Sequence, residues 1–105
     1  MIPPRILTIA GSDSSGGAGI QADVKTITML GGYAMTAITA ITAQNTVGVG
    51  RIHSATPELV REQVQACEND IGFDAIKIGM LRSGSIAETV WDCLIGLHPQ
   101  VPIVF

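Results

Sequence analysis

The sequence predicts an α/β fold in which a mostly parallel sheet is covered by helices on both faces. β-prone apolar stretches alternate with stretches of helical spacing, which is the order expected for parallel strands joined by helices. Only 14% of the residues are charged and 47% are hydrophobic, as a sheet buried on both sides requires. Residues 5–23 read as a strand that ends in a glycine turn and feeds a helix, where α/β enzymes open a ligand site.

The first strand and the first helix are joined by this glycine-rich turn. A β-branched apolar run predicts a strand over 5–10, which stops at Gly11. Apolar residues then recur at helical spacing, which predicts a helix over 17–30 ended by Gly31-Gly32. The residues expected on its buried face are Ile20, Val24, Ile27 and Leu30. Unpaired N–H groups at the helix start favour an anion or a polar ligand there.

A second strand and a second helix follow. The Thr- and Ile-rich run over 33–43 predicts a strand, and the glycine-containing residues 45–55 are expected to form a loop, with short extended pieces left open as an alternative. Thr56-Pro57 is typical of a helix start, so a helix should run from there to about Asp70. The residues expected on its buried face are Leu59 or Val60, Val64 and Cys67.

The remaining residues predict one more helix between two strands. The strands are expected over 75–79 and 101–105, and the helix over 83–97. Ser85 and Glu88 are spaced like a capping box at the start of this helix. The chain should therefore contribute about four strands to the sheet.

Composition argues against several classes of partner. The net charge is −3 and the six Lys and Arg residues are scattered, which disfavours nucleic-acid binding. No apolar run reaches the ~20 residues of a membrane helix, and residues 1–13 lack the layout of a signal peptide. Cys67 and Cys93 have no CxxC spacing and are interpreted as free thiols. We expect a cytoplasmic protein without a membrane or nucleic-acid partner and without a metal site within these residues.

Two known phosphate loops fit the glycine-rich turn poorly. The spacing at 11–16 suits a Walker loop, but Gly17-Ala18 follows where that loop needs lysine. A dinucleotide fingerprint is met loosely by Gly17, Gly19 and Ala22, but the acidic residue expected about twenty positions later is missing. A Rossmann-type oxidoreductase is therefore disfavoured, and a plain strand-to-helix turn stays open as an alternative.

Three segments in order carry a more specific resemblance. They are GSDSSGGAGIQAD at 11–23, TAITAQNTVGV at 39–49 and AIKIGML at 75–81. Together they resemble the hydroxymethylpyrimidine and phosphomethylpyrimidine kinases of thiamine biosynthesis, members of the ribokinase-like superfamily. The likeness runs through essentially the whole chain and implies a three-layer α/β/α fold. It also implies ATP-dependent phosphorylation of 4-amino-5-hydroxymethyl-2-methylpyrimidine, of its monophosphate, or of both.

The same resemblance implies which part of the protein binds the pyrimidine and which part binds ATP. Kinases of this kind are more than twice as long, so residues 1–105 are expected to be the amino-terminal portion of a single kinase domain. This portion would supply the pyrimidine pocket, whereas ATP and Mg²⁺ would be held mainly by the carboxyl-terminal part. We expect no catalytic residue within residues 1–105, no kinase turnover by them alone, and a homodimer as the working form.

Four residues are expected to bind the substrate. A carboxamide matches the amino group and ring nitrogen of the pyrimidine, as Gln and Asn match adenine, so Gln44 is expected to recognise that edge. Asp23 lies one helical turn after Gly19, whose missing side chain would leave space beside the carboxylate. Gly11 would bring its backbone against the ligand, and Met80 would contact the ring.

Other interpretations of the same residues remain open. Asp13 and Asn45 are lesser candidates that are as well suited to Asx turns. A pyridoxal or pyridoxine kinase is the nearest alternative, although pyridoxine lacks the edge that Gln44 would recognise. A non-catalytic pyrimidine-binding half-domain is the alternative from another class.

Overall fold

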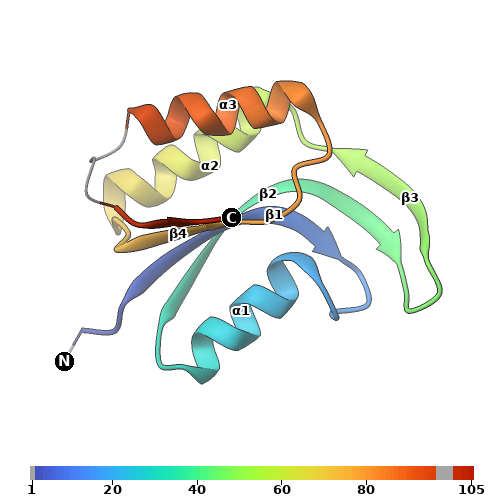
Figure 1. Ribbon diagram of the computed structural model, residues 1–105, viewed down its shortest axis with the longest axis horizontal. Coiled ribbons are helices and arrows are strands. Elements are labelled where there is room, and N and C mark those ends of the chain that lie inside the picture. The colour runs from blue at the N-terminus through green and yellow to red at the C-terminus, as the bar shows by residue number, and fades with distance from the viewer. Residues whose placement is uncertain (1, 97–100) are drawn as a thin grey trace.

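A five-stranded sheet lies between two helical layers in the computed structural model, which describes residues 2–96 and 101–105 (Figure 1). The strands are β1 (Arg5–Asp13), β2 (Tyr33–Gln44), β3 (Val49–Ser54), β4 (Ala75–Ile78) and β5 (Ile103–Val104). The helices are α1 (Gly19–Met29), α2 (Pro57–Asp70) and α3 (Gly84–Ile95). The predicted three-layer α/β class is confirmed, since α1 covers one face of the sheet and α2 and α3 cover the other (Figure 1).

The sheet is parallel except at one edge. Its strand order is β3-β2-β1-β4-β5, with β1 in the middle. β1 pairs in parallel with β2 and β4, and β4 pairs in parallel with β5, whereas β3 runs antiparallel to β2. The carboxyl ends of β1, β2 and β4 therefore meet at one edge of the sheet, which is where ligand sites form in such folds.

The two faces of the sheet differ in chemistry. Leu7 and Ile9 of β1 are fully buried in the apolar core, to which α2 and α3 also contribute. The cluster consists of Leu7, Ile9, Met35, Ala37, Val60, Val64, Phe73, Ile76, Ile78, Ile86, Val90 and Leu94. Thr8 lies between Leu7 and Ile9 on the opposite face, where its hydroxyl reaches α1. Most of the hydrophobic stabilisation, ~1.5–3 kcal/mol for each large side chain, therefore comes from the α2 and α3 side.

Helix α2 begins as the sequence predicts. The hydroxyl of Thr56 accepts a hydrogen bond from the Leu59 N–H at 3.1 Å, and Pro57 occupies the first turn. Val60 is fully buried while Leu59 is 50% exposed, which settles the choice between the two. Cys67 and Cys93 are free and only half-buried, and burial raises the pKa of both thiols.

The prediction of a loop over 45–55 was wrong in its second half, which forms β3. All six residues of β3 are exposed, so the sequence shows no alternation between buried and open positions. The strand is held by pairing with β2, and the preceding turn is closed by Asn45, whose side-chain oxygen accepts from the N–H groups of Val47 and Gly48. The sheet therefore has five strands rather than about four.

Several predicted boundaries also shift. β1 continues to Asp13 rather than ending at residue 10, because it stays paired with β2 beyond Gly11. Helix α1 covers 19–29, so Leu30 is the C-cap residue and is 83% exposed instead of buried. The N-cap of α3 is Ser83, which accepts from the Ile86 N–H, so the predicted capping box is not the start of this helix. The predicted end of that helix, at residue 97, lies outside the described residues.

Candidate substrate pocket

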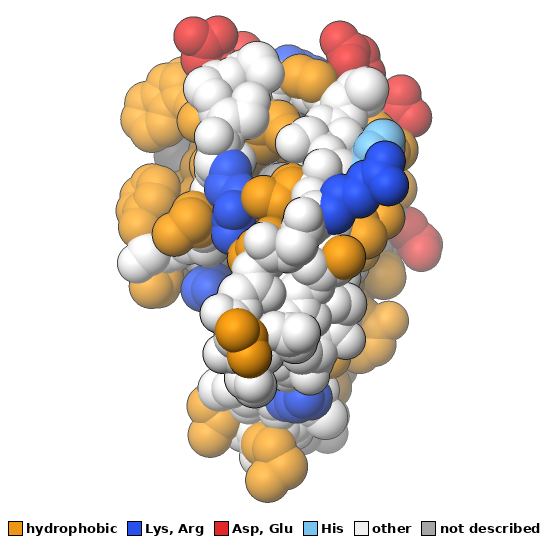
Figure 2. Space-filling model, turned by 90° about the vertical axis from the view of Figure 1, so that its right-hand side faces the viewer, with side chains coloured by type: hydrophobic (Ala, Val, Ile, Leu, Met, Phe, Trp, Pro, Cys, Tyr) orange, Lys and Arg blue, Asp and Glu red, His pale blue; other side chains and the backbone are white. Residues whose placement is uncertain are grey.

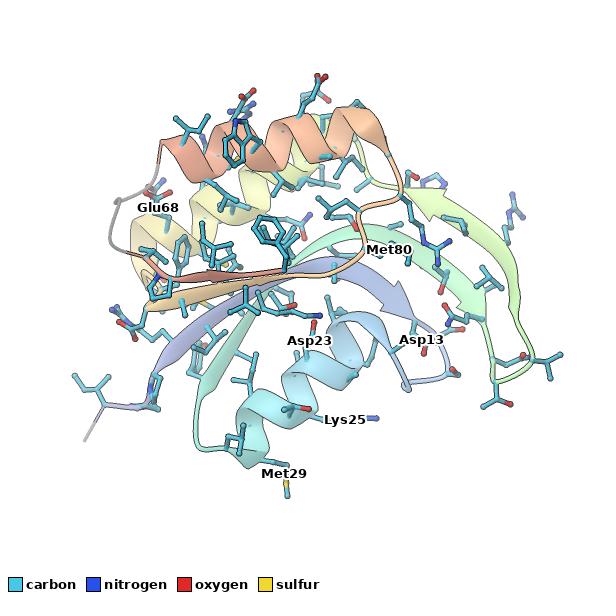
Figure 3. All side chains as sticks on the ribbon, viewed as in Figure 1. Asp13, Asp23, Lys25, Met29, Glu68 and Met80 are labelled. Atoms are coloured by element: carbon cyan, nitrogen blue, oxygen red, sulfur yellow. The ribbon has the colours of Figure 1, made fainter. Side chains whose placement is uncertain are left out.

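A cavity of about 200 Å³ opens at the carboxyl ends of β1, β2 and β4. It is lined by Ala10, Gly11, Ser12, Asp13, Ala18, Gly19, Thr39, Ala40, Thr42, Gln44, Lys77, Gly79, Met80 and Arg82. Gly11, Gln44 and Met80, three of the four residues expected to bind substrate, thus line one pocket. Figure 3 places Met80 and Asp13 near this end of the sheet, with Asp23 reaching from α1 toward the sheet. Asp23, the fourth, is not part of the lining.

The loop between β1 and α1 is organised by the buried carboxylate of Asp13. Its Oδ1 accepts from the N–H and the hydroxyl of Ser15, at 2.9 and 2.7 Å. Its Oδ2 accepts from the N–H groups of Gly17 and Ala18, at 3.0 and 2.8 Å. These bonds, above all the one from the Ser15 hydroxyl, lower the pKa of Asp13.

This arrangement uses two of the N–H groups that precede helix α1. The N–H groups of Gly17 and Ala18, which were expected to favour an external anion, donate to the protein's own carboxylate instead. Asp13 forms the Asx turn that the sequence left open as an alternative. These two N–H groups are therefore not available to an anion, whereas the first turn of α1, which begins at Gly19, has no side-chain cap.

Gly19 allows α1 to start directly against β1. Its φ is +58°, and a Cβ at this position would overlap the carbonyl oxygen of Gly11. The chain passes close enough at this point for Ser12 and Gly19 to form an isolated bridge. Gly19 was expected to leave space beside Asp23, and the structure gives a further reason for glycine here, which is this close approach.

Gln44 is held at the pocket by both its backbone and its side chain. Its N–H donates to the Ser14 hydroxyl oxygen at 2.7 Å, and that hydroxyl donates to the Gln44 carbonyl at 2.6 Å. The Thr42 hydroxyl lies 3.0 Å from Gln44 Oε1 and 2.7 Å from the Ser12 carbonyl. A hydroxyl carries one proton, so Thr42 donates to one of these oxygens at a time.

Asp23 is connected to the pocket through Lys77. Its Oδ2 accepts from the buried Thr8 hydroxyl at 2.6 Å and from Lys77 Nζ at 2.9 Å. Lys77 itself lines the pocket, so the carboxylate lies one side chain away from the cavity. The role of Asp23 in binding substrate stays a prediction.

Sequence reasoning did not identify Lys77 or Arg82. Lys77 did leave a signal, because it stands between the buried Ile76 and Ile78 and so points to the opposite face of the strand, where Asp23 lies. A lysine at such a position needs a partner, which Asp23 supplies. Arg82 follows the strand as an ordinary loop residue, and nothing in the sequence marks its backbone angle of +58°.

The surface around the pocket is more basic than the chain as a whole. Figure 2 faces the end of the sheet that is on the right in Figure 1 and shows Lys and Arg side chains around its middle, with acidic ones at its upper margin.

Among residues 2–96 and 101–105, no group of three or more His, Cys, Asp or Glu side chains could hold a metal ion. No helix in the same residues is long and apolar enough to cross a membrane.

Comparisons with known sequences identify the family of this chain. The sequence model of a family described as Phosphomethylpyrimidine kinase matches residues 13–105. A Mycobacterium tuberculosis protein named hydroxymethylpyrimidine/phosphomethylpyrimidine kinase is 51% identical over 104 residues, which are 99% of this chain and 38% of that protein. This chain therefore spans well under half the length of that curated relative.

Two solved structures are similar over nearly the whole chain. One is the crystal structure of phosphomethylpyrimidine kinase from Clostridium difficile, with a TM-score of 0.91 and 46% identity over 96% of this chain and 44% of that one. The other is pyridoxal kinase from Staphylococcus aureus in complex with AMP-PCP and pyridoxal, with a TM-score of 0.84. The two sequences are 34% identical, and the similar region covers 99% of this chain and 39% of the pyridoxal kinase chain.

Proposed function

This chain belongs to the phosphomethylpyrimidine kinase family, and we propose on that premise that the whole protein phosphorylates a hydroxymethylpyrimidine. The acceptor would be 4-amino-5-hydroxymethyl-2-methylpyrimidine, its monophosphate, or both, and the reaction would serve thiamine biosynthesis. The single observation that carries the proposal is the pocket, in which Gln44, Met80 and the Gly11 backbone meet at the carboxyl edge of the sheet.

The chemistry of the pocket suits a small aminated ring. The carboxamide of Gln44 can accept from the exocyclic amino group and donate to the adjacent ring nitrogen. Met80 supplies a flexible apolar contact for the ring or its methyl group. The cavity of about 200 Å³ is smaller than the ~300–1,000 Å³ typical of pockets for drug-sized ligands, so it suits one ring rather than a nucleotide.

Asp23 would act within the same site by fixing Lys77. The ammonium group has three donors, and one of them is directed to the Asp23 carboxylate. The others can reach toward the cavity that Lys77 lines. In this proposal Lys77, held by Asp23 and Thr8, donates to an acceptor atom of the bound pyrimidine.

The phosphate donor requires other parts of the whole protein. The cavity of about 200 Å³ is too small for ATP, and the described residues contain no group of three or more His, Cys, Asp or Glu side chains that could hold a metal ion by themselves. We propose that residues 1–105 are the amino-terminal portion of one kinase domain, that they are inactive alone, and that the remainder binds ATP and Mg²⁺.

Pyridoxal is a second candidate acceptor. The likeness to the Staphylococcus aureus pyridoxal kinase supports it, because 34% identity extends over 99% of this chain. Pyridoxal has no amino group beside a ring nitrogen, however, and would leave the carboxamide of Gln44 partly unpaired. The pyrimidine is therefore the better match for this pocket.

We also propose a cytoplasmic homodimer. The exposed strand β3 supports the dimer, because its edge is unpaired in the described residues and it presents Val49 and Ile52, each 42% exposed. Sedimentation of the full-length protein should give the mass of two chains. A single-chain mass at micromolar concentration would contradict this part of the proposal.

The test of the function uses the full-length protein with Mg²⁺ and radiolabelled ATP. The hydroxymethylpyrimidine, its monophosphate and pyridoxal are offered as acceptors at equal concentration. We expect phosphorylation of at least one pyrimidine with a higher kcat/KM than for pyridoxal. Preference for pyridoxal would favour the second candidate, and pyrimidine binding without phosphate transfer would favour a non-catalytic binding protein.

A further inference from the structure

We propose that Arg82 is a specificity-determining residue that binds the phosphate of a phosphorylated pyrimidine at the mouth of the pocket. This inference rests on the proposed function and deepens it, because it separates the monophosphate from the unphosphorylated alcohol. The carrying observation is an arginine in a left-handed backbone conformation that lines the pocket beside Met80 and Gln44.

The backbone of Arg82 is in an unusual conformation. Its φ is +58°, and among the described residues it is the one position with positive φ that is not glycine. Glycine adopts this conformation without steric cost, whereas an arginine does not. Strain of this kind is concentrated at functional sites, where the side chain contributes something that glycine would lose.

The position of Arg82 is fixed on both sides. Strand β4 ends at Ile78, four residues before it, and Ser83, directly after it, caps helix α3. The Ser83 N–H also donates to the carbonyl of Leu81 at 2.6 Å, which closes a tight turn around Arg82. Arg82 therefore lines the pocket from a short loop anchored at both ends.

The charges that line the pocket favour an anion at this point. The ionisable residues of the lining are Asp13, Lys77 and Arg82. Asp13 is engaged by the N–H groups of its own loop, and Lys77 is paired with Asp23. No hydrogen bond or ion pair to the Arg82 guanidinium is found among residues 2–96 and 101–105, so its charge is available to a ligand.

Phosphate is the group that fits this guanidinium. Arginine presents a planar fork of donors that matches phosphate oxygens and holds them with charge-assisted bonds. The cavity has room for one ring, so a phosphate on the exocyclic carbon would extend toward the open rim, where Arg82 and Met80 are both exposed. A phosphate of the nucleotide is the other possible source, and the experiment distinguishes the two.

The experiment compares binding of three ligands to the full-length protein and its variants. Calorimetry measures the Kd of the hydroxymethylpyrimidine, of its monophosphate without nucleotide, and of ATP with Mg²⁺. Arg82→Gly removes the guanidinium, and because glycine adopts the observed backbone conformation readily, this variant should fold. Arg82→Ala also removes the guanidinium and is measured alongside it. Arg82→Lys keeps the charge without the fork, and Arg61→Ala removes an arginine of α2, outside the pocket lining, as the matched control.

We expect both Arg82→Gly and Arg82→Ala to raise the Kd of the monophosphate about tenfold to a hundredfold. The Kd of the alcohol and of ATP should stay within about twofold of wild type in both variants. Arg82→Lys should give a Kd for the monophosphate between those of wild type and Arg82→Ala, and Arg61→Ala should match wild type for all three ligands.

Three results would overturn the inference while leaving the proposed function standing. These are equal weakening of both pyrimidines, weakening of ATP alone, and no change in any ligand. A wild-type protein that binds neither pyrimidine would remove the proposed function and this inference with it.

Discussion

Lys77 Nζ lies 2.9 Å from Asp23 Oδ2, and this ion pair joins helix α1 to strand β4 directly beside the pocket. The same carboxylate oxygen accepts from the buried Thr8 hydroxyl of β1, so three elements meet at one atom. Because Lys77 lines the cavity and Asp23 does not, the pair determines where a positive charge is presented to a ligand.

Asp23→Asn should therefore weaken both folding and binding of the substrate. An amide keeps the shape of the carboxylate but no longer neutralises Lys77, so we expect ~1–2 kcal/mol less stability. The Kd of the pyrimidine in the full-length protein should rise about tenfold as the ammonium loses its fixed position. Calorimetry and urea unfolding measure the two effects.

The matched control for Asp23→Asn is Asp70→Asn at the exposed end of α2. It removes one negative charge far from the cavity, where a carboxylate has no favourable interaction with the helix dipole. We expect wild-type binding from this control. Asp23→Asn binding the pyrimidine as tightly as wild type would remove Asp23 from the site.

Gln44→Ala tests the residue that would recognise the ring. Loss of a two-point contact to the amino group and ring nitrogen should weaken pyrimidine binding by ~1–3 kcal/mol in the full-length protein. Gln65→Ala, on the exposed surface of α2, is the matched control and should leave the Kd unchanged. An unchanged dissociation constant in Gln44→Ala would exclude this side chain from the pocket.

The Thr42 hydroxyl should contribute to stability and to substrate binding, because it lies within hydrogen-bond distance of Gln44 Oε1 and of the Ser12 carbonyl. Thr42→Val keeps the shape of the buried side chain but removes the hydroxyl that lies near both oxygens. We expect ~1–2 kcal/mol lower stability and a several-fold higher Kd for the pyrimidine. Thr42→Ser restores the hydroxyl and should recover most of the binding, whereas equal losses in both variants would indicate a packing effect only.

Gly19→Ala and Gly48→Ala are a matched pair of variants that test the close approach of α1 to β1. Gly19→Ala places a Cβ against the Gly11 carbonyl in a left-handed conformation, so it should destabilise the protein by ~2 kcal/mol or more. A Cβ at Gly48 would meet nothing within 4 Å, so Gly48→Ala should be tolerated. Urea unfolding of both variants tests the close approach, which would be refuted by equal stability.

Acid should weaken the fold through Asp74. The guanidinium of Arg5 donates to this carboxylate at 2.9 Å and lowers its pKa to about 2. The unfolded chain, with an ordinary pKa of about 4, binds the proton first as the pH falls. The contribution of Asp74 to stability is thus complete above about pH 4 and is lost as the pH falls through about 2. Unfolding curves between these values should be less pH-dependent in Asp74→Asn, and an unchanged slope would contradict the assignment.

The sequence predicted those parts of the fold that local chemistry determines. Thr56-Pro57 begins α2 as expected, since capping and proline act within a few residues. β3 was missed because its six residues are all exposed and only the pairing with β2 makes them a strand. Within the pocket, Gln44 and Met80 could be placed because they follow strands whose carboxyl ends must meet.

The remaining parts of the site depend on contacts that are distant in the chain. The partner of Lys77 is 54 positions earlier, and no local pattern indicates which acid it will meet. The positive φ of Arg82 arises from the tight connection between β4 and α3, which residue type alone does not reveal. Tertiary packing, rather than local propensity, placed both cations at the cavity.

The unequal faces of the sheet bear on how such a protein can change. Because most of the apolar contacts that hold the domain together lie with α2 and α3, pocket side chains on the α1 side can be exchanged without opening this core. New ligand preferences could therefore arise by altering Lys77, Arg82 or their neighbours while the scaffold behind them stays intact.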